Sequence, residues 1–189
     1  MRKKYYFIFI SVLILISFGI VHSNSTNLKK YLNSGTKIDS YAKNFMPAIK
    51  DLPEYQNISF KYNHFSLVLL GTGGITLVVK YNEDTYENEK KKLAEKYKYL
   101  DHKVFSNFDR SKYYIPEYEF SINNYIFKVV DSSENYQAEY PKSFGMIGIS
   151  EEEKSIAYLY FLDLDLDFIE EDSENPMAVF VKKNFKYDF

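Results

Sequence analysis

The pattern of hydrophobic and polar positions begins with one long apolar run. Seventeen uncharged, mostly apolar residues extend from Tyr5 to Val21, directly after the basic residues 2–4. A basic head before an apolar run is typical of an export signal, and the head stays on the cytoplasmic side. The length fits a signal peptide cleaved after Ser23 and an uncleaved anchor equally well. We therefore predict that residues 1–23 are a signal peptide or an N-terminal membrane anchor.

The chain after this run divides into a linker and one domain. Residues 24–35 are polar and rich in Ser and Asn, which predicts a linker. Residues 36–189 are sufficient for one packed core, so we expect a single domain there. Apolar positions at helical spacing between Ile38 and Phe45 indicate a short helix that ends before Pro47.

After Pro53 the apolar positions change to a period of two, which indicates strands. Apolar and polar residues alternate over 58–62. Two further strand-like runs, 66–70 and 75–81, flank Gly71–Gly74. We predict that Gly71–Gly74 is the turn of a β-hairpin, because a phosphate-binding loop would lead into a helix with Lys followed by Ser or Thr.

The second half of the chain continues in the same style. Strands are predicted at 117–122, 125–130, 144–149 and 155–163, with a tight turn at Asn123-Asn124. This half adds two consecutive antiparallel pairs to the expected sheet.

Two further helices complete the pattern. One is predicted after residue 82, where Glu87 stands three positions after Asp84 as in a capping box. The other begins at Pro176 and places Met177 and Phe180 on one face. These elements predict an α+β fold: a mainly antiparallel sheet of about six or seven strands with two or three helices packed on one face, preceded by the hydrophobic export segment.

Composition and charge limit the partners. The chain has no cysteine, so no disulfide stabilises the exported part. Residues 24–189 hold 21 basic and 26 acidic residues, and residues 131–175 hold 13 acids but only Lys142 and Lys154. An acidic surface does not favour a phosphate backbone, so we expect no nucleic-acid partner. A cation or a basic protein partner fits this charge better.

The acidic half contains a strictly alternating stretch, residues 161–168, which reads FLDLDLDF. Counted from Asp163, acidic side chains follow the ligand spacing of an EF-hand calcium loop, with the backbone of Ile169 at position 7. The candidate metal ligands are Asp163, Asp165, Asp167, Glu171 and Glu174, and calcium is the candidate ion. Against this, Phe168 stands where the loop requires glycine, and the preceding residues have the pattern of a strand.

The pattern favours a simpler interpretation of the same stretch. Successive side chains of a strand point to opposite faces, so Leu162 and Leu164 would be buried while Leu159 and Phe161 begin a second face that the aspartates continue into solvent. On that interpretation the aspartates are too widely spaced for one ion unless the strand ends or bends among them.

Catalytic motifs do not appear in the sequence. His64 and His102 are the histidines after residue 23, and neither stands in a triad or zinc motif, so the catalytic residues are unknown. Paired carboxylates can serve as acid and base, which keeps a carboxylate-dependent hydrolase of envelope material as an alternative.

The leading hypothesis is an exported or membrane-tethered bacterial envelope protein that acts as a binding module. Its acidic surface would recruit a cation or a basic protein partner at the extracytoplasmic face of the membrane, or after secretion. Lysine outnumbers arginine 22 to 2, a bias typical of AT-rich bacterial genomes. The alternatives are the hydrolase and a purely structural domain.

Overall fold

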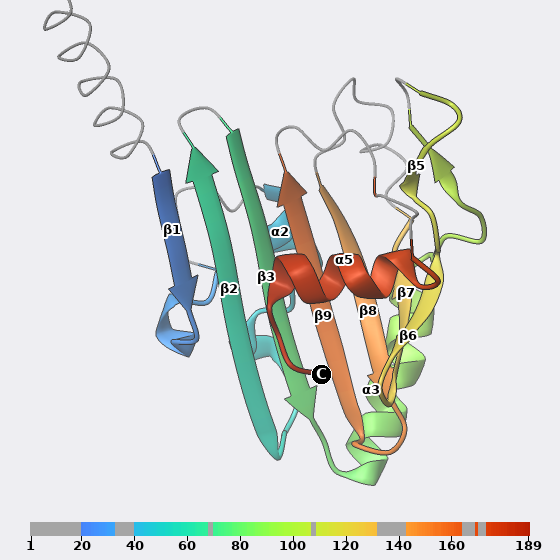
Figure 1. Ribbon diagram of the computed structural model, residues 1–189. Helices are drawn as coiled ribbons and strands as arrows, with labels where there is room; N and C mark the ends of the chain where they lie inside the picture. The colour runs from blue at the N-terminus through green and yellow to red at the C-terminus, as the bar shows by residue number, and fades with distance from the viewer. Residues whose placement is uncertain are drawn as a thin grey trace, which may run out of the picture.

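The computed structural model describes residues 20–32, 40–67, 70–106, 109–131, 143–163, 169 and 173–189. Its centre is a seven-stranded antiparallel sheet with the strand order β1-β2-β3-β9-β8-β7-β6 (Figure 1). The strands of this sheet are β1 Ile20–Ser25, β2 Asn57–Leu67, β3 Leu70–Lys80, β6 Glu119–Ile122, β7 Tyr125–Val129, β8 Ser143–Ser150 and β9 Ser155–Asp163. A second sheet pairs β4 Val104–Phe105 with β5 Tyr113–Ile115.

The described α-helices are α2 Ser40–Phe45, α3 Glu83–Lys96 and α5 Pro176–Phe185, and two 3-10 turns are η1 Leu28–Lys30 and η2 Ile49–Asp51. The predicted α+β class with a mainly antiparallel sheet is confirmed. None of the helices in the described ranges is long and apolar enough to cross a membrane. Residues 1–19, which carry most of the predicted export segment, lie outside those ranges.

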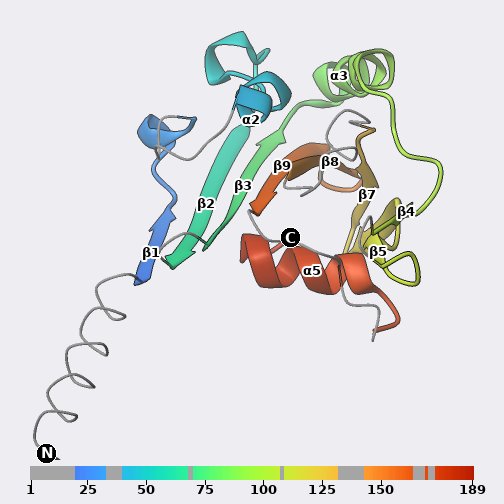
Figure 2. The same ribbon diagram turned by 90° about the horizontal axis from the view of Figure 1, so that it is seen from above.

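Helices cover both faces of the sheet, which corrects the prediction of one covered face. Figure 2 shows α2 and α3 on one face and α5 on the other, with the sheet curved around α5. Each face has its own core cluster. Tyr86 of α3 belongs to the first cluster with Leu77 and Tyr158, and Phe180 of α5 belongs to the second with Leu159 and Phe161.

β9 is a central strand with both faces buried. It lies between β3 and β8, and its residues from Ser155 to Phe161 are all buried. Tyr158 and Tyr160 point to the α3 side, whereas Leu159 and Phe161 point to the α5 side. The predicted strand is confirmed, and α5 covers the face on which Leu159 and Phe161 lie. Of the aspartates predicted to continue this face into solvent, Asp163 is half-buried, and Asp165 and Asp167 lie outside the described residues.

β2 and β3 form the predicted hairpin, although the turn is not at Gly71–Gly74. The register pairs Leu67 with Leu70, and Gly71–Gly74 lie within β3. At Gly74 a Cβ would lie 3.1 Å from the carbonyl oxygen of Asn184. The glycine therefore serves the close approach of α5 to the sheet rather than a turn.

Local signals explain the ends of two other elements. The Asn82 side chain caps α3 by accepting a hydrogen bond from the N–H of Thr85 at 2.9 Å, so the cap lies before the predicted Asp84. Asn123 has a φ of 50°, and β6 and β7 pair directly on either side of Asn123-Asn124. The predicted tight turn is thus confirmed.

β1 is an edge strand that the hydrophobic pattern does not predict. It pairs antiparallel with Tyr62–Leu67 of β2 and joins the end of the predicted export segment to the start of the predicted linker, 24–35. Tyr31, which follows η1, is buried with its ring centroid 5.1 Å from that of Phe60. The described part of the predicted linker therefore packs on the domain.

Candidate functional site

The predicted acidic site begins at the end of β9. Asp163 pairs with Thr72 of β3, and the Thr72 hydroxyl donates to Asp163 Oδ2 at 2.8 Å. Asp163 is half-buried and lies two residues after Phe161, hence on the α5 face. Glu174 is exposed just before α5. Three candidate ligands lie outside the described residues: Asp165, Asp167 and Glu171.

The acidic segment, residues 163–174, makes a second contact with the domain at Ile169. This residue is buried, and its N–H donates to the carbonyl oxygen of Tyr113 in β5 at 2.9 Å. The strand β9 precedes the segment, as the sequence pattern predicts, whereas an EF-hand has a helix there. Among the described residues no three His, Asp or Glu side chains are grouped to hold a metal ion. A cation site of another geometry on residues 163–174 stays a prediction.

Described carboxylates elsewhere in residues 131–175 form ion pairs with lysines from earlier in the chain. These pairs are Glu151–Lys90 at 2.7 Å, Glu153–Lys80 at 2.9 Å and Asp131–Lys98 at 2.8 Å. Exposed pairs of this kind contribute little stability. They do cancel part of the negative charge that the sequence concentrates in residues 131–175.

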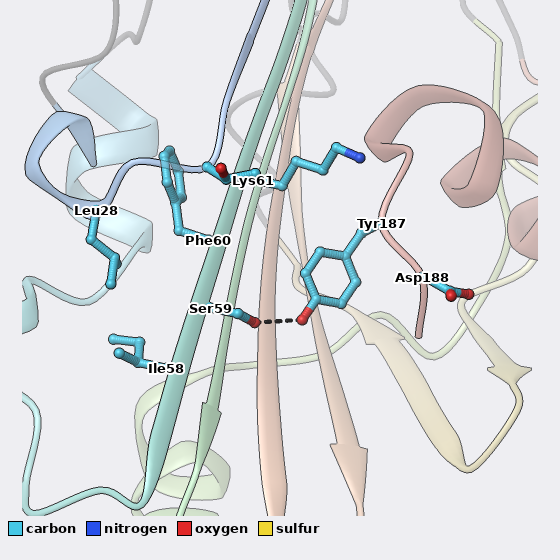
Figure 3. A pocket seen from close by; sticks show the side chains of 8 residues that line it. Leu28, Ile58, Ser59, Phe60, Lys61, Tyr187 and Asp188 are labelled. Atoms are coloured by element: carbon cyan, nitrogen blue, oxygen red, sulfur yellow. Dashed lines mark hydrogen bonds between the residues drawn. The ribbon is translucent and has the colours of Figure 1, made fainter.

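A site that the sequence does not reveal lies at the edge of β2. β1 pairs only with Tyr62–Leu67, so the outer edge of Asn57–Lys61 has no strand partner among the described residues. A hollow of about 450 Å³ lies beside this edge (Figure 3). We call it the edge groove, and its lining consists of Thr26, Leu28, Ile58, Ser59, Phe60, Lys61, Tyr187 and Asp188.

The edge groove has an apolar side and a polar side because β2 alternates. Ile58 and Leu28 are half-buried and pack against the core cluster that includes Phe60. On the opposite face the Ser59 hydroxyl and the Tyr187 hydroxyl share a hydrogen bond (Figure 3). The Lys61 ammonium group, on the same face, donates to the carbonyl oxygen of Lys186.

One backbone N–H at this edge is satisfied by a local side chain where the described residues supply no neighbouring strand. The N–H of Ile58 donates to Oδ1 of the adjacent Asn57 at 2.8 Å. Such a bond is easily exchanged for one to another chain, because an unpaired strand edge is a ready template for pairing. The edge groove thus combines exchangeable backbone groups with space for side chains.

The C-terminal tail, residues 186–189, places a carboxylate beside this edge. Lys186 ends α5 in the left-handed conformation and turns the chain back across the sheet. Phe189 is held at the far side by its ring contact with Phe127, and Asn123 Nδ2 donates to its carbonyl oxygen. Asp188, between these anchors, is exposed and borders both the edge groove and a second hollow of about 390 Å³.

The buried tyrosines of the other face have a structural role. Burial raises the pKa of Tyr31, Tyr81 and Tyr158 above the ordinary value of a phenol. These hydroxyls therefore stay protonated at physiological pH, and Tyr31 donates to the carbonyl oxygen of Pro47 at 2.9 Å. The Tyr31 hydrogen bond connects the end of η1 to the residue that follows α2 and Met46, and the three rings belong to one core cluster.

Searches with protein-family models, curated proteins and solved structures give no match to this chain.

Proposed function

We propose that this protein is a binding module at the extracytoplasmic face of a bacterial membrane, and that it takes an extended basic segment of a partner protein at the edge groove. The carrying observation is the outer edge of Asn57–Lys61, which has no strand partner among the described residues and borders a hollow of about 450 Å³. A chain added there gains backbone hydrogen bonds from β2, while pockets for alternate side chains provide selectivity.

The two sides of the edge groove define the partner's pattern. Alternate side chains of an added strand point to opposite faces, so one set meets Leu28 and Ile58 and the other meets Tyr187 and Asp188. The first set would be apolar and the second polar. The polar side carries one ammonium group, that of Lys61, which donates to the carbonyl oxygen of Lys186, and one exposed carboxylate, that of Asp188. Because residues 24–189 have five more acids than bases, a basic side chain is favoured opposite Asp188.

A labelled peptide of alternating valine and lysine tests this proposal by fluorescence anisotropy. We expect saturable binding to the wild-type protein that weakens as salt is raised, because part of the attraction is between exposed charges. Asp188→Asn should weaken binding by roughly two- to fivefold, the effect of one exposed charge pair. Glu95→Gln, the same charge change at an exposed position of α3, is the matched control and should leave binding unchanged.

Hydrogen exchange then identifies which strand edge is used. Bound peptide should slow amide exchange in Asn57–Lys61 and leave β6, the opposite edge strand, unchanged. Equal binding of a valine–glutamate peptide, or protection at β6 instead of β2, would contradict the proposal.

A second binding role is proposed for residues 163–174, which carry the candidate ligands Asp163, Asp165, Asp167, Glu171 and Glu174. The supporting observation is that the segment is fixed at Asp163 by Thr72 and at Ile169 by Tyr113. Contacts at these two positions restrict the backbone of the segment. They therefore reduce the conformational entropy that the carboxylates lose when they gather around a cation such as calcium.

Thermal unfolding with calcium, magnesium or chelator tests this second role. A cation at a hundred times its dissociation constant should add about 2.7 kcal/mol to the free energy of unfolding, and Asp165→Asn should remove that gain. Glu152→Gln, an exposed carboxylate in the β8–β9 turn, serves as the control. Coincident curves in all three conditions would refute the cation role without bearing on the edge groove.

A further inference from the structure

β1 is built from the end of the predicted export segment. Residues Ile20–Ser23 belong both to that segment, 1–23, and to β1. They pair in continuous register with β2, from Ile20 opposite Leu67 to Ser23 opposite His64. The bond after Ser23, where a signal peptidase would cut, therefore lies inside a paired strand.

A cut at that bond would dismantle β1. It would remove four of the six residues that pair with β2 and leave only Asn24 and Ser25. The outer edge of β2, open at Asn57–Lys61 in the intact chain, would then be open at His64–Leu67 as well. The residues of β2 opposite Ile20–Ser23 would then lose the strand with which they pair, and an unpaired strand edge is a template for pairing with another chain.

We infer that the exported chain keeps its N-terminal segment, and that β1 joins the domain to the membrane anchor without an intervening linker. This inference rests on the proposal that residues 1–23 are an export segment, and it selects the anchor over the cleaved signal. Retention has a structural reason: it keeps Val21 and Ser23, which pair with Ser66 and His64 in the folded domain.

Intact mass spectrometry of the full chain, expressed in a bacterial host and separated into membrane and soluble fractions, tests the inference. We expect a membrane-bound chain of 22.4 kDa that retains residues 1–23. A reference sample, residues 24–189 exported behind a standard cleavable signal peptide, shows the mass and fraction of the cut form. A mature chain that starts at Asn24 would overturn the inference but not the proposed binding role.

The other outcomes are also decisive. A full-length chain found only in the soluble cytoplasmic fraction would overturn both the inference and the proposed location. Hydrogen exchange on the detergent-solubilised full chain gives an independent measurement of β1 pairing. We expect the amides of Tyr62–Leu67 that point toward β1 rather than β3 to exchange at least about tenfold more slowly than the amides of Asn57–Lys61 that point the same way. Equal rates would show that β1 does not pair with β2 and would overturn the structural reason for retention.

Discussion

Gly148 is a residue at which one added carbon should have a large effect. A Cβ there would lie 2.7 Å from Cδ1 of Phe127, a fully buried side chain. The ring has no room to move, because it stacks on Phe120 with ring centroids 5.4 Å apart and meets Phe189 at 5.0 Å. We predict that Gly148→Ala lowers the free energy of unfolding by about 1–3 kcal/mol, as overpacked cores do. Urea denaturation measures the change.

Gly73→Ala is the matched control at the residue scale. The nearest atom to a Cβ at Gly73 is Nδ1 of His64 at 3.6 Å, an ordinary contact, and no glycine in the described ranges has a positive φ. The substitution should therefore change stability by less than about 1 kcal/mol, with a small gain from the stiffer unfolded chain. Equal losses at Gly73 and Gly148 would contradict the role of Phe127.

At the scale of elements, two ion pairs connect α3 to the β8–β9 turn: Lys90 with Glu151 and Glu83 with Lys154. Lys90 of α3 donates to Glu151 Oε1 at 2.7 Å. This hydrogen bond holds the pKa of Glu151 below its ordinary value of 4.5. We predict that Glu151→Gln costs up to about 1 kcal/mol of unfolding free energy at neutral pH, the range for an exposed pair.

The pH dependence of that difference follows from the sign of the shift. A carboxyl whose pKa is lowered on folding stabilises the protein above its unfolded pKa and loses that contribution as pH falls through the folded pKa. The difference in unfolding free energy between the wild type and Glu151→Gln should stay constant above about pH 4.5 and decrease below it. Denaturation at several pH values measures it, with Glu152→Gln as the neighbouring control. A gap that widens in acid would be inconsistent with the ion pair.

The elements differ in how much their sequences reveal. Alternation predicts β9 because the period of a strand is a local property, but α5 decides that its second face is buried, and no local pattern encodes where a helix packs. Glycine occurs both in turns and where two backbone segments approach closely. The sequence therefore predicted a turn at Gly71–Gly74, whereas these residues lie within β3 and Gly74 contacts the end of α5. β1 was not predicted because its apolar residues, Ile20 and Val21, continue the apolar run of the predicted export segment.

The edge groove also could not be predicted from the sequence. Asp188 reaches it only because Lys186 takes a φ of 50° and turns the tail back across the sheet. Left-handed C-caps are usually glycine, so a lysine gives no signal for this turn. Asp163 was predictable as the end of a strand, whereas its partner Thr72 required the register of β9 against β3.

At the scale of the whole molecule, the proposed membrane anchor and β1 together predict how the domain would be oriented on a membrane. Residues 1–19 precede Ile20, which lies opposite Leu67 at one end of the sheet. If residue 19 leaves the bilayer, that end must lie at its surface, and Asn57, at the other end of β2, must point away. Phe65 is near the membrane end, and eight residues of extended chain put it about 26 Å from Asn57.

The chain has no cysteine, so single cysteines can be labelled selectively to measure this orientation. We predict that a fluorophore on Phe65→Cys, at an exposed position, is quenched by nitroxide lipids in vesicles that contain the full chain. A fluorophore on Asn57→Cys, also exposed, should be quenched far less, because collisional quenching does not extend across about 26 Å. Equal quenching at both positions would mean a flexible tether between anchor and sheet. That result would return residues 24–35 to the role of linker and would leave the edge groove free to face the membrane as well as a partner.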